Sequence, residues 1–206
     1  MTDTPISSCV EKVAVLGGAF DPFHNGHVAA IRHLLRSGKI DTVLVVPSGD
    51  RPDKPQVSSA LDRLEMTRRG VRAEFAGDPR VEVSDIQVSG QVKYGTIDLV
   101  RYFETLSSKE PHFVIGQELL HDLPIWKDAA ELQKKARFLV LRRPGAGNAD
   151  VAHGWNVTYL EPFGACGVEL SSTELRERLR AGSACEESMP KAVFTYCRER
   201  KLYCGG

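Results

Sequence analysis

Two histidines follow a pair of glycines in the segment 17–27, which reads GGAFDPFHNGH. Gly17 and Gly18 allow the backbone to come close to a ligand, because a residue without a Cβ leaves room. His24 and His27 lie three residues apart where a predicted strand gives way to a helix, so both imidazoles can point toward one ligand. The amino end of a helix offers unpaired amides and positive partial charge, which suit phosphate. These residues predict a site for a phosphorylated ligand.

The glycine-rich segment differs from the common phosphate-binding loops. It contains neither the GxxxxGK[ST] pattern of a Walker A loop nor a GxGxxG fingerprint. Two histidines at this spacing can also form a surface pair or part of a metal site. No Cys, Asp or Glu follows at a metal-ligand spacing, so we predict no metal ligands here. The glycines before the pair, and Gly26 inside it, favour a ligand site over a structural pair.

A second segment with suitable chemistry lies far along the chain, at 171–176, and reads SSTELR. The hydroxyls of Ser171, Ser172 and Thr173 can cap a helix and also offer donors at its first turn. Arg176 lies one turn further on and can reach a phosphate bound at that helix end. A plain helix cap followed by a solvated arginine is the alternative interpretation, and this segment alone leaves it open.

Short β-branched runs and amphipathic stretches alternate along the chain, and these elements must position both segments. Strands are predicted at 13–16, 42–46, 81–83, 112–115, 138–141 and 157–160, and helices at 26–37, 59–76, 96–106, 129–135, 172–180 and 190–201. Strands separated by helices indicate an α/β fold, a Rossmann-like doubly wound parallel sheet flanked by helices. We expect a single domain over 1–206 with a short flexible N-terminus over 1–10. Such sheets bind ligands at the carboxyl ends of their strands.

Composition limits the classes of protein that the chain can belong to. It has 206 residues, of which 42% are hydrophobic and 26% charged, which excludes a disordered chain. Lys plus Arg and Asp plus Glu both number 27, so a general nucleic-acid coat is not expected. No leader peptide and no apolar run of membrane-spanning length are visible. We therefore expect a cytoplasmic protein that binds neither nucleic acid nor membrane, and five scattered cysteines that stay reduced.

One predicted helix carries a run of basic residues, namely Arg63, Arg68, Arg69 and Arg72. The simpler interpretation is a solvated helix face. The alternative is a basic rim that steers phosphate groups toward the site.

Together the two segments resemble the nucleotidyltransferase superfamily with the HxGH signature, here 24–27, and its SSTxxR-type motif, here 171–176. Within that superfamily the chain resembles the bacterial nicotinate-nucleotide adenylyltransferases along nearly its whole length. Besides the opening GGAFDPFHNGHV, the matching segments are YGTID at 94–98, IGQELL at 115–120 with Trp126, RPG at 143–145, and the last helix.

The resemblance implies adenylyl transfer from ATP to nicotinate mononucleotide, which gives deamido-NAD and pyrophosphate in NAD biosynthesis. It implies that the catalytic residues are His24, His27 and Arg176. The ATP-binding residues would be Gly17, Gly18, Ala19, Phe20, Gly116, Arg143, Ser171, Ser172 and Thr173. The acceptor-binding residues would be Lys54, Thr96 and Trp126. Mg²⁺ would accompany ATP, with no protein residue as its ligand, and the sequence leaves a homo-oligomer open.

Several residues depart from the family pattern. Ala19 stands where Thr or Ser is common, and Glu118 stands in place of Asp. Gly49, Asp53 and Gly95 differ on the side that the resemblance assigns to the acceptor. The reaction type therefore rests on better-preserved residues than the acceptor does. Two alternatives stay open: the same chemistry with another acceptor, such as nicotinamide mononucleotide, or a nucleotide-binding module without catalysis.

Overall fold

The computed structural model describes residues 10–50, 56–93, 95–142, 154–162 and 171–204. Six parallel strands form one sheet in the order β3-β2-β1-β4-β5-β6. The strands are β1 Glu11–Gly18, β2 Thr42–Pro47, β3 Val81–Val83, β4 Lys109–Gly116, β5 Arg137–Leu141 and β6 Asn156–Tyr159. The helices are α1 Asn25–Arg36, α2 Ala60–Phe75, α3 Thr96–Phe103, α4 Ala129–Lys135, α5 Ser172–Arg180 and α6 Lys191–Glu199, with the 3₁₀ helices η1 Gln117–Ile125 and η2 Glu186–Ser188. The predicted doubly wound α/β fold is confirmed.

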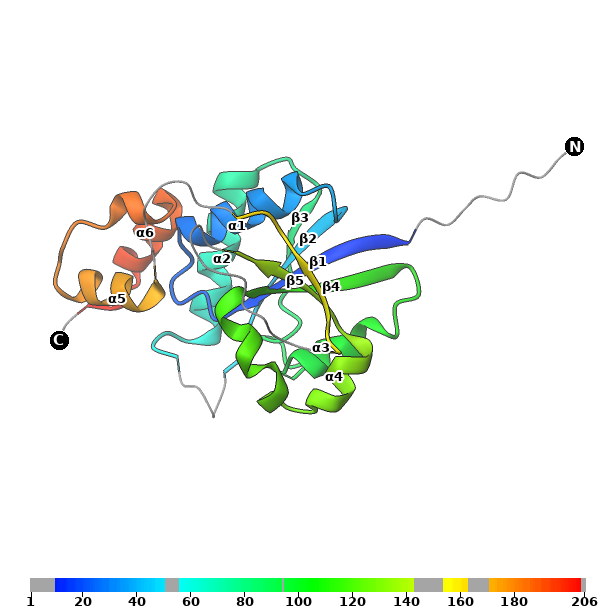
Figure 1. Cartoon of the computed structure of the whole chain (residues 1–206). Coiled ribbons are helices and arrows are strands. Elements are labelled where there is room, and N and C mark those ends of the chain that lie inside the picture. Colours follow the sequence, from blue (N-terminus) through cyan, green and yellow to red (C-terminus); the bar gives the residue numbers. More distant parts are fainter. Residues whose placement is uncertain (1–9, 51–55, 94, 143–153, 163–170, 205–206) are drawn as a thin grey trace, which may run out of the picture.

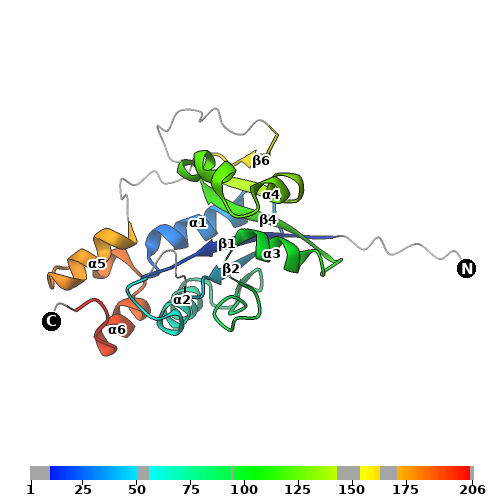
Figure 2. The same cartoon turned by 90° about the horizontal axis from the view of Figure 1, so that it is seen from below.

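Helices cover both faces of the sheet (Figures 1 and 2). Alternate residues of β1 point to opposite faces, as a pleated strand requires. Ala14 and Leu16 pack in one hydrophobic cluster with side chains of α1 and α2. Val13 and Val15 pack in a second cluster with side chains of α3, η1 and α4. A strand buried on both faces explains why the sequence of β1 is continuously apolar from Val13 to Leu16 rather than alternating.

The order of the strands places the candidate residues together. β1 lies between β2 and β4. From β1 the chain builds the sheet outward through β2 and β3 on one side, and then through β4, β5 and β6 on the other side. Open α/β sheets bind ligands at such a reversal of strand order. Gly18 at the end of β1 pairs with Pro47 at the end of β2. The segments that follow β1, β2 and β4 therefore leave the sheet along one edge.

Helices α5 and α6 lie together beyond that edge, and α6 packs on α2 (Figure 1). Val193, Tyr196 and Cys197 of α6 are buried in the same cluster as the side chains of α1. The end of the described chain thus returns to the loop after β1, although the two are far apart in the sequence.

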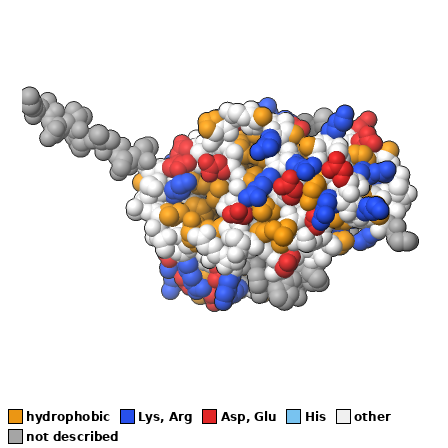
Figure 3. Space-filling model, turned by 180° about the vertical axis from the view of Figure 1, so that it is seen from behind, with side chains coloured by type: hydrophobic (Ala, Val, Ile, Leu, Met, Phe, Trp, Pro, Cys, Tyr) orange, Lys and Arg blue, Asp and Glu red, His pale blue; other side chains and the backbone are white. Residues whose placement is uncertain are grey.

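On the face seen in Figure 3, Lys and Arg side chains are interspersed with Asp and Glu side chains. Within the described ranges, every helix is too short or too polar to cross a lipid bilayer. The cysteines that the structure describes, Cys185, Cys197 and Cys204, are free thiols, and burial raises the pKa of Cys197 to about 12.

The helix ends follow the local sequence. Ser59 caps α2 by accepting a hydrogen bond from the amide of Asp62 at 3.1 Å. Helix α3 ends at Phe103 rather than at the predicted residue 106. The 3₁₀ helix η1 was not predicted, because its nine residues contain Pro124 and have no regular apolar spacing.

Candidate active site

The loop between β1 and α1 turns sharply over the end of the sheet. Phe20 has a positive φ of 52°, and the Asp21–Pro22 peptide bond is cis. The Phe20 ring lies so close to Gly18 that a Cβ there would be 3.0 Å from its Cζ atom. Gly18 therefore leaves room for the ring, which in turn touches His27 edge-on, with 4.8 Å between ring centroids.

The two histidines cap α1 reciprocally. His24 Nδ1 accepts the amide of Gly26 at 3.1 Å, and His27 Nδ1 accepts the amide of His24 at 3.1 Å. A neutral imidazole that accepts through Nδ1 carries its proton on Nε2. Each histidine is thus held as an Nε2–H donor by the backbone, which the spacing of the motif alone does not reveal.

Burial keeps both imidazoles neutral. Desolvation lowers the pKa of His24 to about 4. Desolvation, followed by the proximity of His24, also holds the pKa of His27 well below its usual value. The two rings stack with 3.8 Å between their centroids, and Phe23 stacks on the other side of His27 at 5.3 Å. At neutral pH the site therefore presents uncharged donors rather than imidazolium ions.

Helix α5 brings the second motif to this loop. Arg176 donates through Nη1 to the carbonyl of Asp21 at 2.7 Å and through Nη2 to Thr173 Oγ1 at 3.0 Å. Ser172 donates its hydroxyl to the carbonyl of Pro22 at 3.2 Å, and the Ser171 hydroxyl accepts the amide of Glu174. The Ser172 hydroxyl docks the helix and the Ser171 hydroxyl caps it, so the first-turn amides other than that of Glu174 are the donors left for a ligand.

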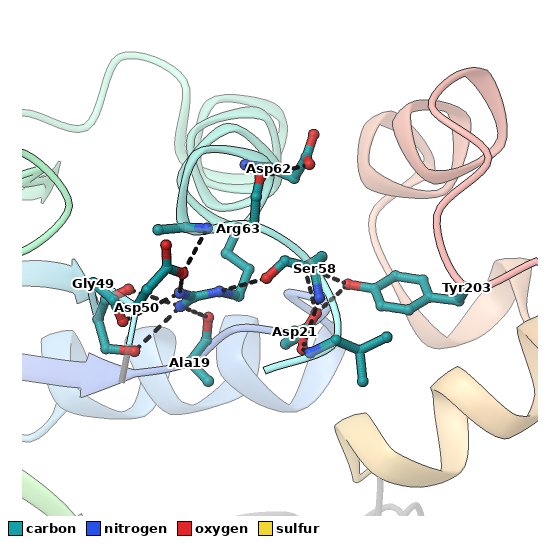
Figure 4. A network of polar contacts seen from close by, with 12 residues as sticks. Ala19, Asp21, Gly49, Asp50, Ser58, Asp62, Arg63 and Tyr203 are labelled. Atoms are coloured by element: carbon teal, nitrogen blue, oxygen red, sulfur yellow. Dashed lines mark hydrogen bonds and ion pairs between the residues drawn. The ribbon is translucent and has the colours of Figure 1, made fainter. Parts of the chain in front are cut away.

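The carboxylate of Asp21 is the centre of a buried network (Figure 4). It accepts hydrogen bonds from the amide of Val57 at 2.8 Å, from the Ser58 hydroxyl and from the Tyr203 hydroxyl, both at 2.5 Å. Burial raises the pKa of Tyr203 above its usual value, so it stays a hydroxyl donor. The network fastens the loop after β1 to the start of α2 and to the C-terminal segment.

Arg63 corrects an interpretation made from the sequence. It lies on α2 and is fully buried, at 0% exposure, so it is not part of a solvated face. Its guanidinium donates to backbone carbonyls of three segments, including those of Ala19 and Ser48 (Figure 4). The other described arginines of the run lie at the surface, where Arg68 pairs with Asp85 at 3.0 Å and Arg69 with Glu65 at 2.7 Å.

Two of the residues expected to contact the acceptor, Thr96 and Trp126, belong to segments that pack on the sheet face opposite α1 and α2. Thr96 begins α3, and Trp126 follows η1, half-buried, with its ring 6.2 Å from that of Phe138. Lys127 pairs with Asp98 at 3.2 Å, so the chain next to Trp126 is tied to the first turn of α3. Gly116 ends β4, and a Cβ there would lie 2.3 Å from the Glu118 carboxylate.

Two of the family departures have a local explanation. A Cβ on Gly49 would lie 2.5 Å from the carbonyl oxygen of Gln87, so no side chain fits there unless the backbone moves. A Cβ on Gly95 would lie 2.7 Å from the Asp98 carboxylate, which accepts the amide of Gly95 at 3.3 Å. Neither glycine can be replaced without displacing its neighbour.

Some predicted positions fall outside the described residues. These are Lys54, Asp53, Arg143 and the N-terminal segment 1–9. Three residues that hold the site together, Asp21, Ser58 and Tyr203, were not predicted from the sequence, because their contacts join distant segments. A signal for Arg63 was present: it falls on the helical stripe of Ala60, Thr67 and Gly70, all of them buried.

The arrangement suits a polyphosphate. The loop after β1 leads into α1 with its two neutral Nε2–H donors, and Arg176, one turn into α5, is bonded to the Asp21 carbonyl of the same loop. Donors fixed in this way can stabilise charge that develops on phosphate oxygens.

Comparison with known proteins gives a consistent family. Residues 15–178 match the family described as Cytidylyltransferase-like. A curated protein of Opitutus terrae named "Probable nicotinate-nucleotide adenylyltransferase" is 34% identical over 198 residues, which are 93% of this chain and 97% of that protein. One of Gloeobacter violaceus with the same name is 34% identical over 203 residues, covering 94% and 96%.

A solved structure has the same fold at low identity. It is titled "Plasmodium falciparum nicotinic acid mononucleotide adenylyltransferase complexed with NaAD" and superposes with a TM-score of 0.78. The match covers 94% of this chain and 97% of that one, at 18% identity.

Proposed function

Since the chain belongs to the nicotinate-nucleotide adenylyltransferases, within the cytidylyltransferase-like family, we propose that it transfers the adenylyl group of ATP to nicotinate mononucleotide. The products are deamido-NAD and pyrophosphate, and the reaction belongs to NAD biosynthesis. One observation carries the proposal: Arg176 Nη1 donates to the Asp21 carbonyl at 2.7 Å. This bond fixes an arginine suited to a triphosphate against the loop that carries the two histidines.

The reaction requires no nucleophile from the protein. An oxygen of the acceptor's phosphate bonds to the α-phosphorus of ATP, the bond from that phosphorus to the bridging oxygen breaks, and the electron pair leaves with pyrophosphate. Catalysis then consists of positioning and of stabilising the charge on the phosphate oxygens. His24 and His27 would donate Nε2–H bonds to the oxygens around the α-phosphorus. Arg176 would bind the β- and γ-phosphates, because a guanidinium can make forked, charge-assisted bonds.

Mg²⁺ enters this proposal as part of the nucleotide substrate. The ion neutralises phosphate charge, and it usually keeps several waters and takes few protein ligands. The residues around the histidines fit an ion carried by the phosphates, since the nearby Asp21 carboxylate is already bonded to Ser58 and Tyr203. We place the reaction in the cytoplasm, where ATP and pyridine mononucleotides occur together.

The acceptor is the finer part of the proposal. Trp126 would stack on the pyridine ring, and Thr96 would lie near it. Asp53 adds a negative charge to the loop after β2, and Arg51 and Lys54 are close enough in sequence to offset it. We therefore expect nicotinate mononucleotide to be preferred over nicotinamide mononucleotide in kcat/KM by at least about tenfold, or about 1.4 kcal/mol.

Pyrophosphate release from ATP and Mg²⁺, measured with each mononucleotide in turn, tests the proposal. Formation of deamido-NAD, identified by mass, is the expected result. Equal or reversed use of the two acceptors would point instead to the same chemistry on nicotinamide mononucleotide. Tight ATP binding with no pyrophosphate from either acceptor would indicate a binding module, and the presence of both histidines and Arg176 favours the enzyme over that alternative.

A further inference from the structure

Arg63 is the most deeply buried charged side chain among the described residues, with 0% exposure. Its Nε donates to the carbonyl of Ser58 at 3.3 Å, and its Nη1 donates to the carbonyls of Ala19 at 3.1 Å and Ser48 at 2.7 Å. Its Nη2 donates to the carbonyl of Gly49 at 3.2 Å. One guanidinium therefore holds the backbone of three separate segments, as Figure 4 shows.

The charge of Arg63 is balanced mainly by carbonyl dipoles. The ion pair that the structure gives it is with Asp50 at 3.3 Å, and the side chain of Asp50 is 77% exposed. Burial of a guanidinium is costly, and a well-packed apolar residue often serves stability as well or better. An apolar residue cannot donate hydrogen bonds to several carbonyls. The planar guanidinium of arginine can, because its N–H groups point in fixed directions.

The segments joined by Arg63 belong to the two substrates. Ala19 lies in the loop after β1, which the proposed function gives to ATP, and Ser48 and Gly49 lie in the loop after β2, on the acceptor side. Ser58, in the third segment, also donates to Asp21, whose carbonyl accepts a hydrogen bond from Arg176. The guanidinium of Arg63 thus connects the loop after β1, which we call the ATP loop, with the loop after β2, which we call the acceptor loop.

We propose that Arg63 is a positioning residue whose guanidinium sets the distance between the ATP loop and the acceptor loop. The inference rests on the proposed function. Each substrate binds its own loop, but attack on the α-phosphorus requires both loops at the correct separation. A misplacement of about 1 Å between reacting groups can cost about 100-fold in rate. Loss of the fork should therefore lower kcat much more than it weakens the binding of either substrate.

Arg63→Lys tests this most directly, because lysine keeps a basic group but has a single ammonium, which cannot reach all three segments. We expect kcat to fall by at least about 30-fold. The KM values of ATP and of the acceptor should stay within about threefold, as should the dissociation constant of ATP measured by calorimetry. The matched control is Arg68→Lys, the same change on the same helix at an exposed ion pair, and it should leave kcat unchanged. Thermal unfolding curves ensure that every variant is assayed while folded.

Three results would overturn the proposal. They are a kcat within threefold of the wild type, a loss confined to the KM of one substrate, or an equal loss in the Arg68→Lys control. If Arg63→Lys does not fold, Gly49→Ala provides the second test. Its Cβ would lie 2.5 Å from the Gln87 carbonyl oxygen, so the backbone at Gly49, whose carbonyl accepts a hydrogen bond from Arg63, must shift away from Gln87. The same selective fall in kcat supports the proposal, and an unchanged kcat overturns it.

A failure of the proposed function would be recognised separately. The wild-type protein is assayed first with both mononucleotides, and the Arg63 series then uses the acceptor that reacts. If neither reacts, the proposed function fails. The proposal for Arg63 is then tested by binding alone. A non-hydrolysable ATP analogue should tighten the binding of nicotinate mononucleotide to the wild type but not to Arg63→Lys. Equal tightening in both proteins would overturn it.

Discussion

A neutral histidine has one N–H group, and in this site the backbone decides which nitrogen carries it. Both Nδ1 atoms accept hydrogen bonds from backbone amides, at 3.1 Å each. Protonation of Nδ1 would turn this acceptor into a donor that faces another donor, and the hydrogen bond that caps α1 would be lost. The capping geometry and the burial of the rings therefore act in the same direction. The two imidazoles stay neutral donors over the range in which an exposed histidine would change charge.

His27→Ala should lower kcat by at least about 100-fold, because a fixed donor to developing charge is worth about 3 kcal/mol. The substitution also removes the acceptor for the His24 amide, so the measurement pairs kcat with an unfolding curve. His112→Ala is the matched control, since His112 lies within β4 and is bonded to Glu110 at 2.9 Å. Near-normal turnover of a folded His27→Ala variant would remove His27 from the mechanism.

The lowered pKa of His24 predicts how stability changes with pH. Burial lowers the pKa of His24 from its ordinary value of 6.5 to about 4 in the folded protein, so between these values the unfolded chain binds the proton and the folded chain does not. The free energy of unfolding should therefore decrease as the pH falls from 6.5 to 4, by about 3 kcal/mol from this group. Below pH 4 the folded protein also takes up the proton, and this contribution stops changing.

Urea unfolding at a series of pH values measures this effect. His24→Asn is the matched variant, because asparagine can still cap α1 but does not titrate. The stability of the variant should decrease less between pH 6.5 and pH 4 than that of the wild type. Parallel curves for the two proteins would show that His24 is not the group responsible.

At the scale of the elements, α2 packs against Phe23, and Phe23 in turn stacks on His27. A Cβ on Gly70, in the middle of α2, would lie 2.4 Å from Cδ1 of Phe23. Phe23 is fully buried and stacks on His27 with 5.3 Å between centroids. The absence of a side chain at Gly70 of α2 therefore helps to set the position of the His27 ring on α1.

Gly70→Ala should destabilise the protein by about 1 to 3 kcal/mol through overpacking. This is the reverse of the gain of about 0.5 to 1 kcal/mol that alanine usually brings to a helix interior. Turnover should fall as well, because Phe23, which stacks on His27, must move. Urea unfolding and kcat measure the two effects. Combining the change with Phe23→Leu should recover part of the lost stability, and a Gly70→Ala protein more stable than wild type would contradict the packing argument.

The elements themselves were largely predictable from the sequence. The six strands, their parallel arrangement and the doubly wound fold follow from apolar runs such as that of β1, and they are confirmed. The family suggested by the two motifs is also the one that comparison gives. Helix η1 was missed because a 3₁₀ helix with an internal Pro124 has no apolar period to detect.

The support of the candidate site was not predictable in the same way. Motifs reveal residues that touch a ligand, but Asp21, Ser58 and Tyr203 act through contacts between segments separated by up to 182 residues. Arg63 shows the limit most clearly. Its position among the buried residues of α2 could be predicted from the helical spacing. The carbonyls that it binds could not, because they depend on the conformations of the loops that follow β1 and β2. The roles of the ligand-contacting residues stay predictions until the substrates are bound.

At the scale of the whole molecule, the hydroxyl of Tyr203 joins the C-terminal segment to the ATP loop. Tyr203→Phe should lower the free energy of unfolding by about 1 to 2 kcal/mol, because the buried Asp21 carboxylate loses one of its donors. The KM of ATP should rise, since Asp21 also supports Arg176 through its carbonyl. Urea unfolding and initial rates measure both, and Tyr102→Phe on α3 is the control. Unchanged values for Tyr203→Phe would mean that Ser58 and Val57 suffice for Asp21.

The bond between Tyr203 and Asp21 also fixes when the site can be completed during synthesis. The ribosome adds Asp21 to the growing chain 182 residues before Tyr203. At about 5 to 20 residues per second, this delay is on the order of 10 to 40 s. During that time the loop that carries both histidines has left the ribosome without the hydroxyl that will fasten it. A nascent chain of this protein therefore contains the histidine motif long before it contains the tyrosine that holds the loop of that motif in place.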